Sequence, residues 1–470
     1  MDGWAWKTIK SKGVSGITGM LLGCFLALGS ASNDSIAEGP TRAEAERALE
    51  RAVRYFAAEV STRGGYLWTY SPDLTERAGE GKATASQIWV QPPGTPSVGL
   101  ALLEAGRSTG NRLCLDAATS AARALAWGQL ACGGWDYRID FDPRAERRWR
   151  YFHNENTDKP EAGRNVGTFD DDNSQSALRC LMAVDRATSD PAIHAAVERG
   201  IAFFLQAQFD NGAWPQRYPL STSDYSRYYT FNDNALNDCI ATTWEAWETY
   251  GRQDCRESAL RGGRFIVESQ LDPPQAGWAQ QYDDAMRPAP ARWFEPASCC
   301  SLATVRNIKT LVDLYLWTGD RSFLEPIPAA IEWLDRSTIR PGVWARFYEP
   351  GTNRPIYVNE DREVVYEPVN LRPGYSWSAE YGAAFEMKRY RDVLDRGREV
   401  YSAALGRPMT DKERDRRLAA LGNQARQIVE ALDDRGRWIA QGQIRTTTFI
   451  RNVRTLSEYV RLLAADGGDR

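Results

Sequence analysis

The sequence predicts an all-α protein, an α/α toroid of repeated helical hairpins with long functional loops and a few short strands. Three observations lead to this prediction. Apolar residues recur at helical spacing along much of the chain, tryptophans follow these segments at intervals, and strand-like stretches are confined to short segments near 344–348 and 356–366. With 470 residues, 43% of them hydrophobic, the chain can bury a large core in such a repetitive fold.

The repeat unit is a helical hairpin that ends in a tryptophan, at positions 68, 135, 214, 278, 344 and 438. Turn residues such as Asp, Asn, Ser and Gly separate the paired helices, which we expect at 97–108 with 112–131, 173–187 with 191–208, 235–250 with 254–270, and 301–317 with 321–336. The first helical segment, 43–60, can pair with the last, 447–464. That pairing favours a closed toroid over an open solenoid, with the tryptophan loops at one end.

The N-terminus has the order of a secretory signal. Three lysines precede an apolar run over about 14–28, and small residues follow up to Ala31. We therefore expect a signal peptide over 1–31, a secreted or periplasmic protein, and a mature chain without a stable membrane span. Lipid anchoring through Cys24 is the alternative. The remaining residues, 40–470, are interpreted as a single domain.

Two segments depart from the hairpin pattern. The polar segment 341–377, rich in Arg, Tyr and Pro, is too long for an ordinary connection and is interpreted as a functional loop. The segment 393–430 is strongly charged and is interpreted as a solvated helical face. The formal net charge of the chain is -4, which gives no support to nucleic acid as a partner.

Two similar polar triplets precede successive predicted helices. Asp170-Asp171-Asp172 follows Thr168-Phe169, and Asn232-Asp233-Asn234 follows Thr230-Phe231. Carboxylates with neighbouring amides, in a chain with only two histidines, favour a hard cation such as Ca²⁺ over zinc or copper. Helix capping by the same side chains is the structural alternative. The candidate metal ligands are Asp170, Asp171, Asp172, Asp233 and Asn234.

Arginines and aromatic residues are concentrated on the loops that bear the tryptophans. Arginine binds carboxylates in a bidentate manner and aromatic faces stack on sugar rings, so together they suit an acidic polysaccharide. Surface ion pairing is the alternative for any single arginine. The candidate substrate-binding residues are Trp214, Arg217, Tyr218, Tyr348, Arg354 and Tyr375, and Arg292, Arg346 and Arg362 belong to the same group of loop arginines.

These motifs, taken in order over about 165–380, resemble the family 10 polysaccharide lyases, the α/α-toroid pectate lyases. The resemblance is carried by Gly212-Ala213-Trp214-Pro215-Gln216-Arg217-Tyr218-Pro219, Thr230-Phe231-Asn232-Asp233-Asn234-Ala235, Gln281-Tyr282-Asp283, Ala291-Arg292-Trp293-Phe294-Glu295, Trp344-Ala345-Arg346-Phe347-Tyr348-Glu349, Thr352-Asn353-Arg354-Pro355-Ile356-Tyr357 and Gly374-Tyr375-Ser376-Trp377.

The resemblance implies secretion, Ca²⁺ dependence and β-elimination on pectate (polygalacturonate). Asp233 and the Asp170-Asp171 pair match the calcium-binding acids of the family, and Arg292 and Arg346 match its carboxylate-binding arginines. One position departs from the family pattern, because Glu360 stands where the family has the arginine that acts as the base. Arg292, Arg346 and Arg362 are therefore the candidate catalytic residues, and three outcomes stay open at the base: Arg362 takes the role after a local shift, Glu360 is a different base, or the activity is lost.

Two other functions remain open at this level. A toroid that binds polyuronate without cleaving it would account for Glu360 at the position of the base. A toroid glycosidase would use paired carboxylates such as Asp170 and Asp233 as acid and base.

Overall fold

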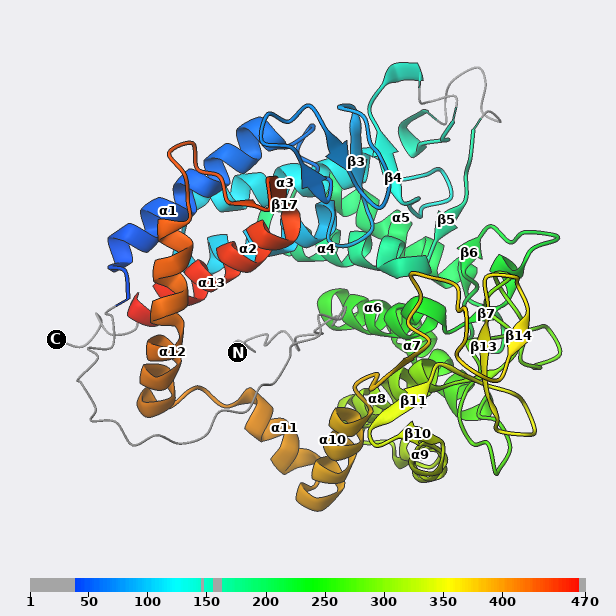
Figure 1. The fold of residues 1–470 in the computed structure, drawn as a ribbon. Helices are drawn as coiled ribbons and strands as arrows, with labels where there is room; N and C mark the ends of the chain where they lie inside the picture. Colours follow the sequence, from blue (N-terminus) through cyan, green and yellow to red (C-terminus); the bar gives the residue numbers. More distant parts are fainter. Residues whose placement is uncertain (1–38, 145–147, 155–162, 465–470) are drawn as a thin grey trace.

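The computed structural model describes residues 39–144, 148–154 and 163–464. These residues form an α/α toroid, as the sequence predicts (Figure 1). The predicted signal peptide lies outside the described residues. Among the helices that are described, none combines the length and the apolar character needed to cross a membrane.

The α-helices lie close to the predicted segments. Pro191 at the first position of one helix and the left-handed Gly110, Gly251 and Gly319 after three others are typical boundary residues. The helices are α1 (Arg42–Tyr55), α2 (Thr95–Thr109), α3 (Arg112–Trp127), α4 (Asn173–Thr188), α5 (Pro191–Ala207), α6 (Ala235–Tyr250), α7 (Gln253–Glu268), α8 (Ser301–Thr318), α9 (Ile327–Arg336), α10 (Ala383–Arg396), α11 (Arg398–Gly406), α12 (Asp411–Glu430) and α13 (Thr446–Ala464).

The helices pack in two rows around the toroid. Helices α13, α2, α4, α6, α8 and α10 follow one another along the inner row, and α1, α3, α5 and α7 follow one another along the outer row. The last helix, α13, packs against both α1 and α2. The predicted pairing of the first and last helical segments is therefore confirmed.

The repeated tryptophans fix each outer helix to the loop that follows it. The indole N–H of Trp135 donates to the carbonyl oxygen of Leu125 at 2.8 Å, and that of Trp214 donates to Phe204 at 2.9 Å. Trp278, Trp344 and Trp438 make the same kind of bond to Ile266, Leu334 and Ile428. The predicted repeat is therefore one of structure for these five tryptophans, each of which is buried in the core. Trp68 departs from it, because it is half-buried and its indole N–H donates to the carbonyl oxygen of Gln91 at 3.0 Å.

A glycine two positions before Trp214 permits this turn. Gly212 has φ +92, and a Cβ atom there would lie 2.3 Å from the carbonyl oxygen of Arg261 on α7. A side chain would therefore be both strained and in collision with the next hairpin.

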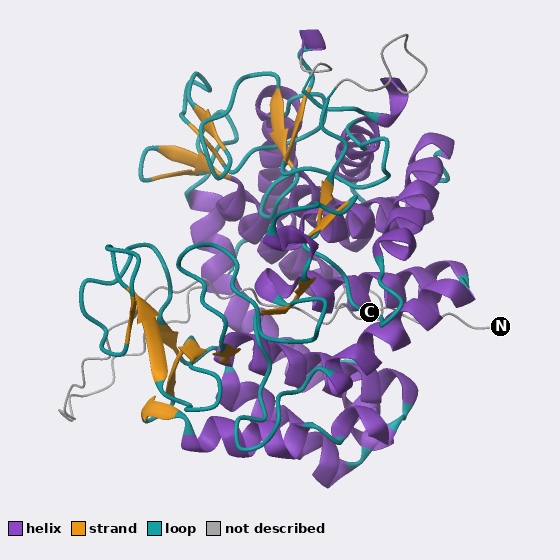
Figure 2. Cartoon of the chain, turned by 90° about the vertical axis from the view of Figure 1, so that its right-hand side faces the viewer, coloured by secondary structure: helices purple, strands orange, loops and turns teal. Residues whose placement is uncertain are grey.

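Short strands and long loops gather at one end of the toroid (Figure 2). Three of the units share one arrangement, in which a strand before the inner helix pairs antiparallel with a strand after the tryptophan: β5 (Gly167–Thr168) with β6 (Arg217–Tyr218), β7 (Tyr229–Thr230) with β8 (Gln281–Tyr282), and β9 (Cys299–Cys300) with β12 (Phe347–Tyr348). The other strands are β1 (Thr69–Tyr70), β2 (Arg77–Ala78), β3 (Gln87–Trp89), β4 (Arg138–Asp140), β10 (Thr338–Arg340), β11 (Val343–Ala345), β13 (Pro355–Val358), β14 (Val364–Val365), β15 (Ser378–Ala379), β16 (Ile439–Ala440) and β17 (Gln443–Arg445).

Candidate active site

Two short 3₁₀ turns form the centre of the site. They are η4 (Asp170–Asp172), which precedes α4, and η6 (Asn232–Asn234), which precedes α6, and they pack against each other. Each has two consecutive residues with positive φ: Asp171 and Asp172 at +50 and +59, Asp233 and Asn234 at +47 and +62. Left-handed backbone is unfavourable for residues other than glycine, although Asp and Asn tolerate it best. The two triplets therefore repeat a strained backbone shape.

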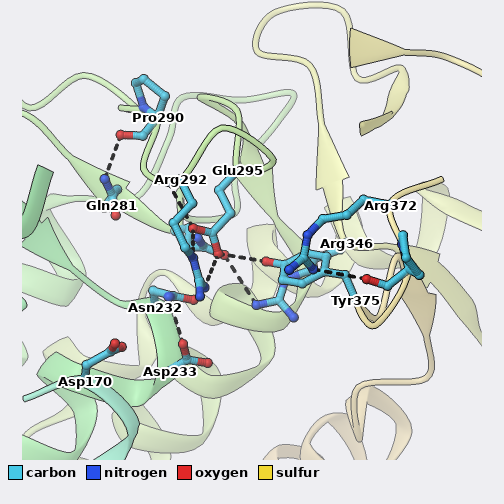
Figure 3. Close-up of polar contacts among 12 residues, drawn as sticks. Asp170, Asn232, Asp233, Gln281, Pro290, Arg292, Glu295, Arg346, Arg372 and Tyr375 are labelled. Atoms are coloured by element: carbon cyan, nitrogen blue, oxygen red, sulfur yellow. Dashed lines mark hydrogen bonds and ion pairs between the residues drawn. The ribbon is translucent and has the colours of Figure 1, made fainter. Parts of the chain in front are cut away.

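These turns bring three carboxylates together. Asp170, Asp171 and Asp233 each offer an oxygen, and the three oxygens lie within 4.8 Å of one another. Tyr137 donates to Asp170 Oδ2 at 2.5 Å, and Gln91 donates to Asp171 Oδ2 at 3.0 Å. The other oxygen of Asp170, Oδ1, is buried and has no hydrogen-bond partner among the described residues. Asp170 and Asp233 face each other across this cluster in Figure 3.

Helix capping does not account for the triplets. Asp172 and Asn234 occupy the N-cap positions of α4 and α6, yet neither side chain accepts a hydrogen bond from its helix. Asp172 instead turns away from the other two carboxylates and binds the Arg179 guanidinium at 2.5 and 2.7 Å. Two members of the first triplet and one of the second are thus left to share a common site.

The carboxylate cluster is electrostatically unfavourable without a cation. Burial and the nearby Asp233 carboxylate raise the pKa of Asp170, and the same two causes raise the pKa of Asp171 to about 8. An all-oxygen donor set with one buried, partner-free carboxylate oxygen fits a hard cation such as Ca²⁺. Asp170, Asp171 and Asp233 are the residues that would hold it.

Arg292 and Arg346 lie beside the carboxylate cluster but differ in their partners (Figure 3). Arg292 is held by Glu295 through two bonds of 2.6 and 2.7 Å. Although burial acts in the opposite direction, Glu295 raises the pKa of Arg292. Arg346 is 7% exposed and forms no ion pair with a described carboxylate, and its Nε has no hydrogen-bond partner. Its guanidinium lies 4.5 Å from the ring centre of Tyr375.

A third arginine near the cluster, Arg306, was not identified from the sequence. It lies on α8, half-buried, and its side chain makes no hydrogen bond or ion pair with a described residue. Burial lowers the pKa of Arg306, while Asp233 and Asp238 oppose this and Arg346 reinforces it. Arg346 differs, because Tyr375, the Cys300 thiol and Asp233 raise its pKa despite its burial. Arg306 therefore differs from Arg217, Arg292 and Arg346 in having a lowered pKa.

The predicted base lies elsewhere. Arg362 is exposed, and its guanidinium lies 5.2 Å from the ring centre of Trp293, which is 45% exposed. Glu360 is also exposed. The segment that departs from the family pattern thus forms part of the outer loop surface.

Two predicted substrate-binding residues are core residues instead. Trp214 is 0% exposed and Tyr348 is 1% exposed, and the Tyr348 hydroxyl donates to the carbonyl oxygen of Ser337. Trp214 serves the structural repeat described above, which explains its recurrence without a substrate. The presence of a large aromatic residue in a polar loop does not tell whether its side chain is buried in the core or exposed for stacking on a sugar.

The other predicted substrate-binding residues lie at different depths. Tyr137 and Asp170 raise the pKa of Arg217 against the effect of its burial. The Tyr375 hydroxyl donates to Glu295 at 3.0 Å. Tyr218 packs its ring against Phe203, and Arg354 is exposed and stacks on Tyr366 at 3.6 Å.

The fold and the site together define a toroid of helical hairpins with a carboxylate cluster beside several arginines. Residues 129–342 match the sequence model of the pectic acid lyase family. This match confirms the predicted relationship to the polysaccharide lyases and includes both acidic turns, Arg292 and Arg306. No curated protein is significantly similar to the chain in sequence.

Solved structures of several carbohydrate-active enzymes are similar at low identity. A family 10 polysaccharide lyase from Cellvibrio cellulosa is 21% identical, with a TM-score of 0.48, over 63% of this chain and 97% of that one. A mutant of that lyase in complex with trigalacturonic acid is 20% identical, with a TM-score of 0.46, over 62% and 98%. The GH76 α-mannanase of Bacteroides thetaiotaomicron is 11% identical, with a TM-score of 0.42, over 91% and 96%.

Proposed function

We propose that this protein is a secreted, Ca²⁺-dependent lyase that cleaves pectate by β-elimination. The observation that carries the proposal is the carboxylate cluster of Asp170, Asp171 and Asp233 beside Arg346, a buried arginine without a carboxylate partner. A uronate carboxylate is the anion that would bind both the cation held by the carboxylate cluster and the guanidinium of Arg346. The pectic acid lyase match over 129–342 supports the same reaction class.

The arginines have different roles in the elimination. Arg346, aided by Arg292, would bind the uronate carboxylate and stabilise the negative charge that develops on it when the C5 proton is removed. Ca²⁺, when bound by the three aspartates, would supply further positive charge at this carboxylate. The electrons of the C5–H bond form the C4–C5 double bond, the C4–O glycosidic bond breaks, and the leaving oxygen takes up a proton.

We propose Arg306 as the base in place of Arg362. A base must reach the proton it removes and must exist in part without its own proton, and arginine normally meets the second condition poorly. Arg306 lies on α8, which packs against the η6 turn that carries Asp233, and burial lowers its pKa, whereas Arg362 is stacked on an exposed tryptophan. Its place on a helix rather than on a motif-bearing loop explains why the sequence did not indicate it.

The test is incubation with polygalacturonate, with added Ca²⁺ and with a chelator, while the ultraviolet absorbance of the unsaturated uronide is followed. We expect the chromophore only with Ca²⁺. A glycosidase would give reducing ends without the chromophore, and a binding protein would give neither, so either result would contradict the proposal.

Paired variants test the base. Arg306→Gln is expected to reduce kcat by about 10²-fold or more with little change in the affinity for polymer, because general-base catalysis contributes typically 10²–10⁴-fold. Arg362→Gln is expected to keep kcat within about threefold. If Arg362→Gln lost kcat and Arg306→Gln kept it, Arg362 would be the base.

A further inference from the structure

Beyond the carboxylate cluster, arginine and aromatic side chains alternate toward the loop surface. Tyr375, which stacks with Arg346, lies 5.1 Å from Phe294 between ring centres, and Phe294 lies 5.3 Å from Trp293. The Arg372 guanidinium covers Phe294 at 3.8 Å. A continuous row therefore leads from the buried arginine to the exposed tryptophan.

The outer end of this row is Trp293 with Arg362, and it has the properties of a binding surface. Trp293 is 45% exposed, although a large indole is usually buried more fully. The Arg362 guanidinium forms no ion pair with a described carboxylate, even though Glu360 and Asp361 precede it and Glu363 follows it.

Arg372, one step further inward, also lacks a carboxylate partner among the described residues and donates only to the carbonyl oxygen of Pro373, at 3.3 Å. The nearby Glu295 is bound by Arg292 and Tyr375. Two positive charges on this row are therefore available to an anionic ligand.

We propose that Trp293 and Arg362 form a distal subsite for the same acidic polysaccharide, beyond the sugar whose carboxylate Arg346 would bind. The indole face would stack on the apolar face of one uronate ring, and the guanidinium would bind the carboxylate of that sugar or of its neighbour. This inference rests on the proposed function. It gives the exposed Arg362 a role in holding the polymer instead of a role in chemistry.

The geometry favours an extended polyanion over a single small anion. The positive charges of Arg346, Arg372 and Arg362 are spread along a row with aromatic rings between them, rather than gathered at one point. A polymer that carries one carboxylate on each sugar repeats both features, a flat ring and a negative charge.

The test compares galacturonate oligomers of increasing length, from the trimer to the octamer, and polygalacturonate. For the wild type we expect KM to fall with length. Trp293→Ala and Arg362→Gln are each expected to remove this gain, with KM about tenfold higher on polygalacturonate and within about twofold of the wild type on the trimer, and with kcat unchanged. A tenfold change corresponds to about 1.4 kcal/mol of binding free energy.

Two exposed residues outside this row serve as matched controls. Arg435, which is exposed and lies 5.8 Å from the ring of Tyr55, is replaced in Arg435→Gln, and Phe385, which is 69% exposed, is replaced in Phe385→Ala. Both are expected to keep the length dependence of the wild type.

Several results would overturn the subsite. KM could rise equally for all lengths, it could stay unchanged for all of them, or Arg362→Gln could abolish the product on every substrate with affinity intact. If the wild type cleaves none of these substrates, the proposed function fails separately. Calorimetric titration of the oligomers with Ca²⁺ present then decides whether Trp293→Ala weakens only the long ones, as the subsite requires.

Discussion

Replacement of Asp171 by asparagine should stabilise the protein in the absence of calcium while weakening calcium binding. Asp171 shares its site with two other carboxylates, and burial together with Asp233 raises its pKa from 3.8 to about 8. A raised carboxyl pKa means that the folded state holds the proton more tightly than the unfolded state does. The charged form therefore destabilises the fold at pH values above the pKa of the unfolded chain.

The magnitude follows from this shift. A displacement of about four pH units, at about 1.4 kcal/mol per unit, gives an upper bound of about 6 kcal/mol. We expect about 1–3 kcal/mol to be measured, because Asp171 retains contact with solvent and Gln91 donates a hydrogen bond to it. The gain should be close to zero near pH 4, should grow as the pH rises, and should be complete above about pH 8.

The assay is urea unfolding at 25 °C in the presence of a chelator, at pH 5 and at pH 9, for the wild type and Asp171→Asn. Calcium titration of the two proteins at pH 9 provides the second measurement, with a loss of at least about tenfold expected for the variant, because a charged ligand is removed. Thr75→Ala, a substitution on an exposed loop, is the control for differences between protein preparations in both measurements. An Asp171→Asn variant that is less stable at pH 9 and binds calcium unchanged would refute the reasoning.

Three further outcomes are expected. Asp233→Ala should remain folded and lose calcium-dependent activity, with far-ultraviolet circular dichroism as the control; retained activity would remove Asp233 from the site. Trp214→Phe should cost about 1–3 kcal/mol in urea unfolding, because the carbonyl oxygen of Phe204 loses its donor, and a loss below about 0.5 kcal/mol would argue against the role of this bond. Arg179→Met should cost about 2–4 kcal/mol because it leaves Asp172 without its bidentate partner, and Asp172→Asn in the same chain should recover part of this loss; no recovery would place the cost in packing instead.

The helical hairpins could be predicted because their signals are local. Apolar spacing, turn residues and the recurring tryptophans are properties of neighbouring residues, and they located α4 and α6 to within a residue or so. The meeting of Asp170, Asp171 and Asp233 was predictable for the same reason, since two similar triplets open successive units. Because the units repeat, a similar local sequence in two of them was enough to predict that residues far apart in the chain lie close together.

Depth in the structure was less predictable than sequence position. Trp214 and Trp293 both stand in polar loops beside arginines, yet the first is fully buried and the second is 45% exposed. Arg306 lies within an amphipathic helix, where an isolated arginine usually indicates a solvated face. Packing of α8 against η6 (Asn232–Asn234) of the preceding unit places it near Asp233, and this depends on contact between whole repeats.

The origin of the two acidic turns in different repeats has a consequence for how this protein assembles. Asp171 and Asp233 lie about 60 residues apart in sequence, and their meeting closes a chain segment whose closure entropy is substantial. An ion shared between them would act as a reversible cross-link between neighbouring hairpins, made without cysteine chemistry. Calcium would then govern both the charge at the site and the cohesion of the repeats that build it.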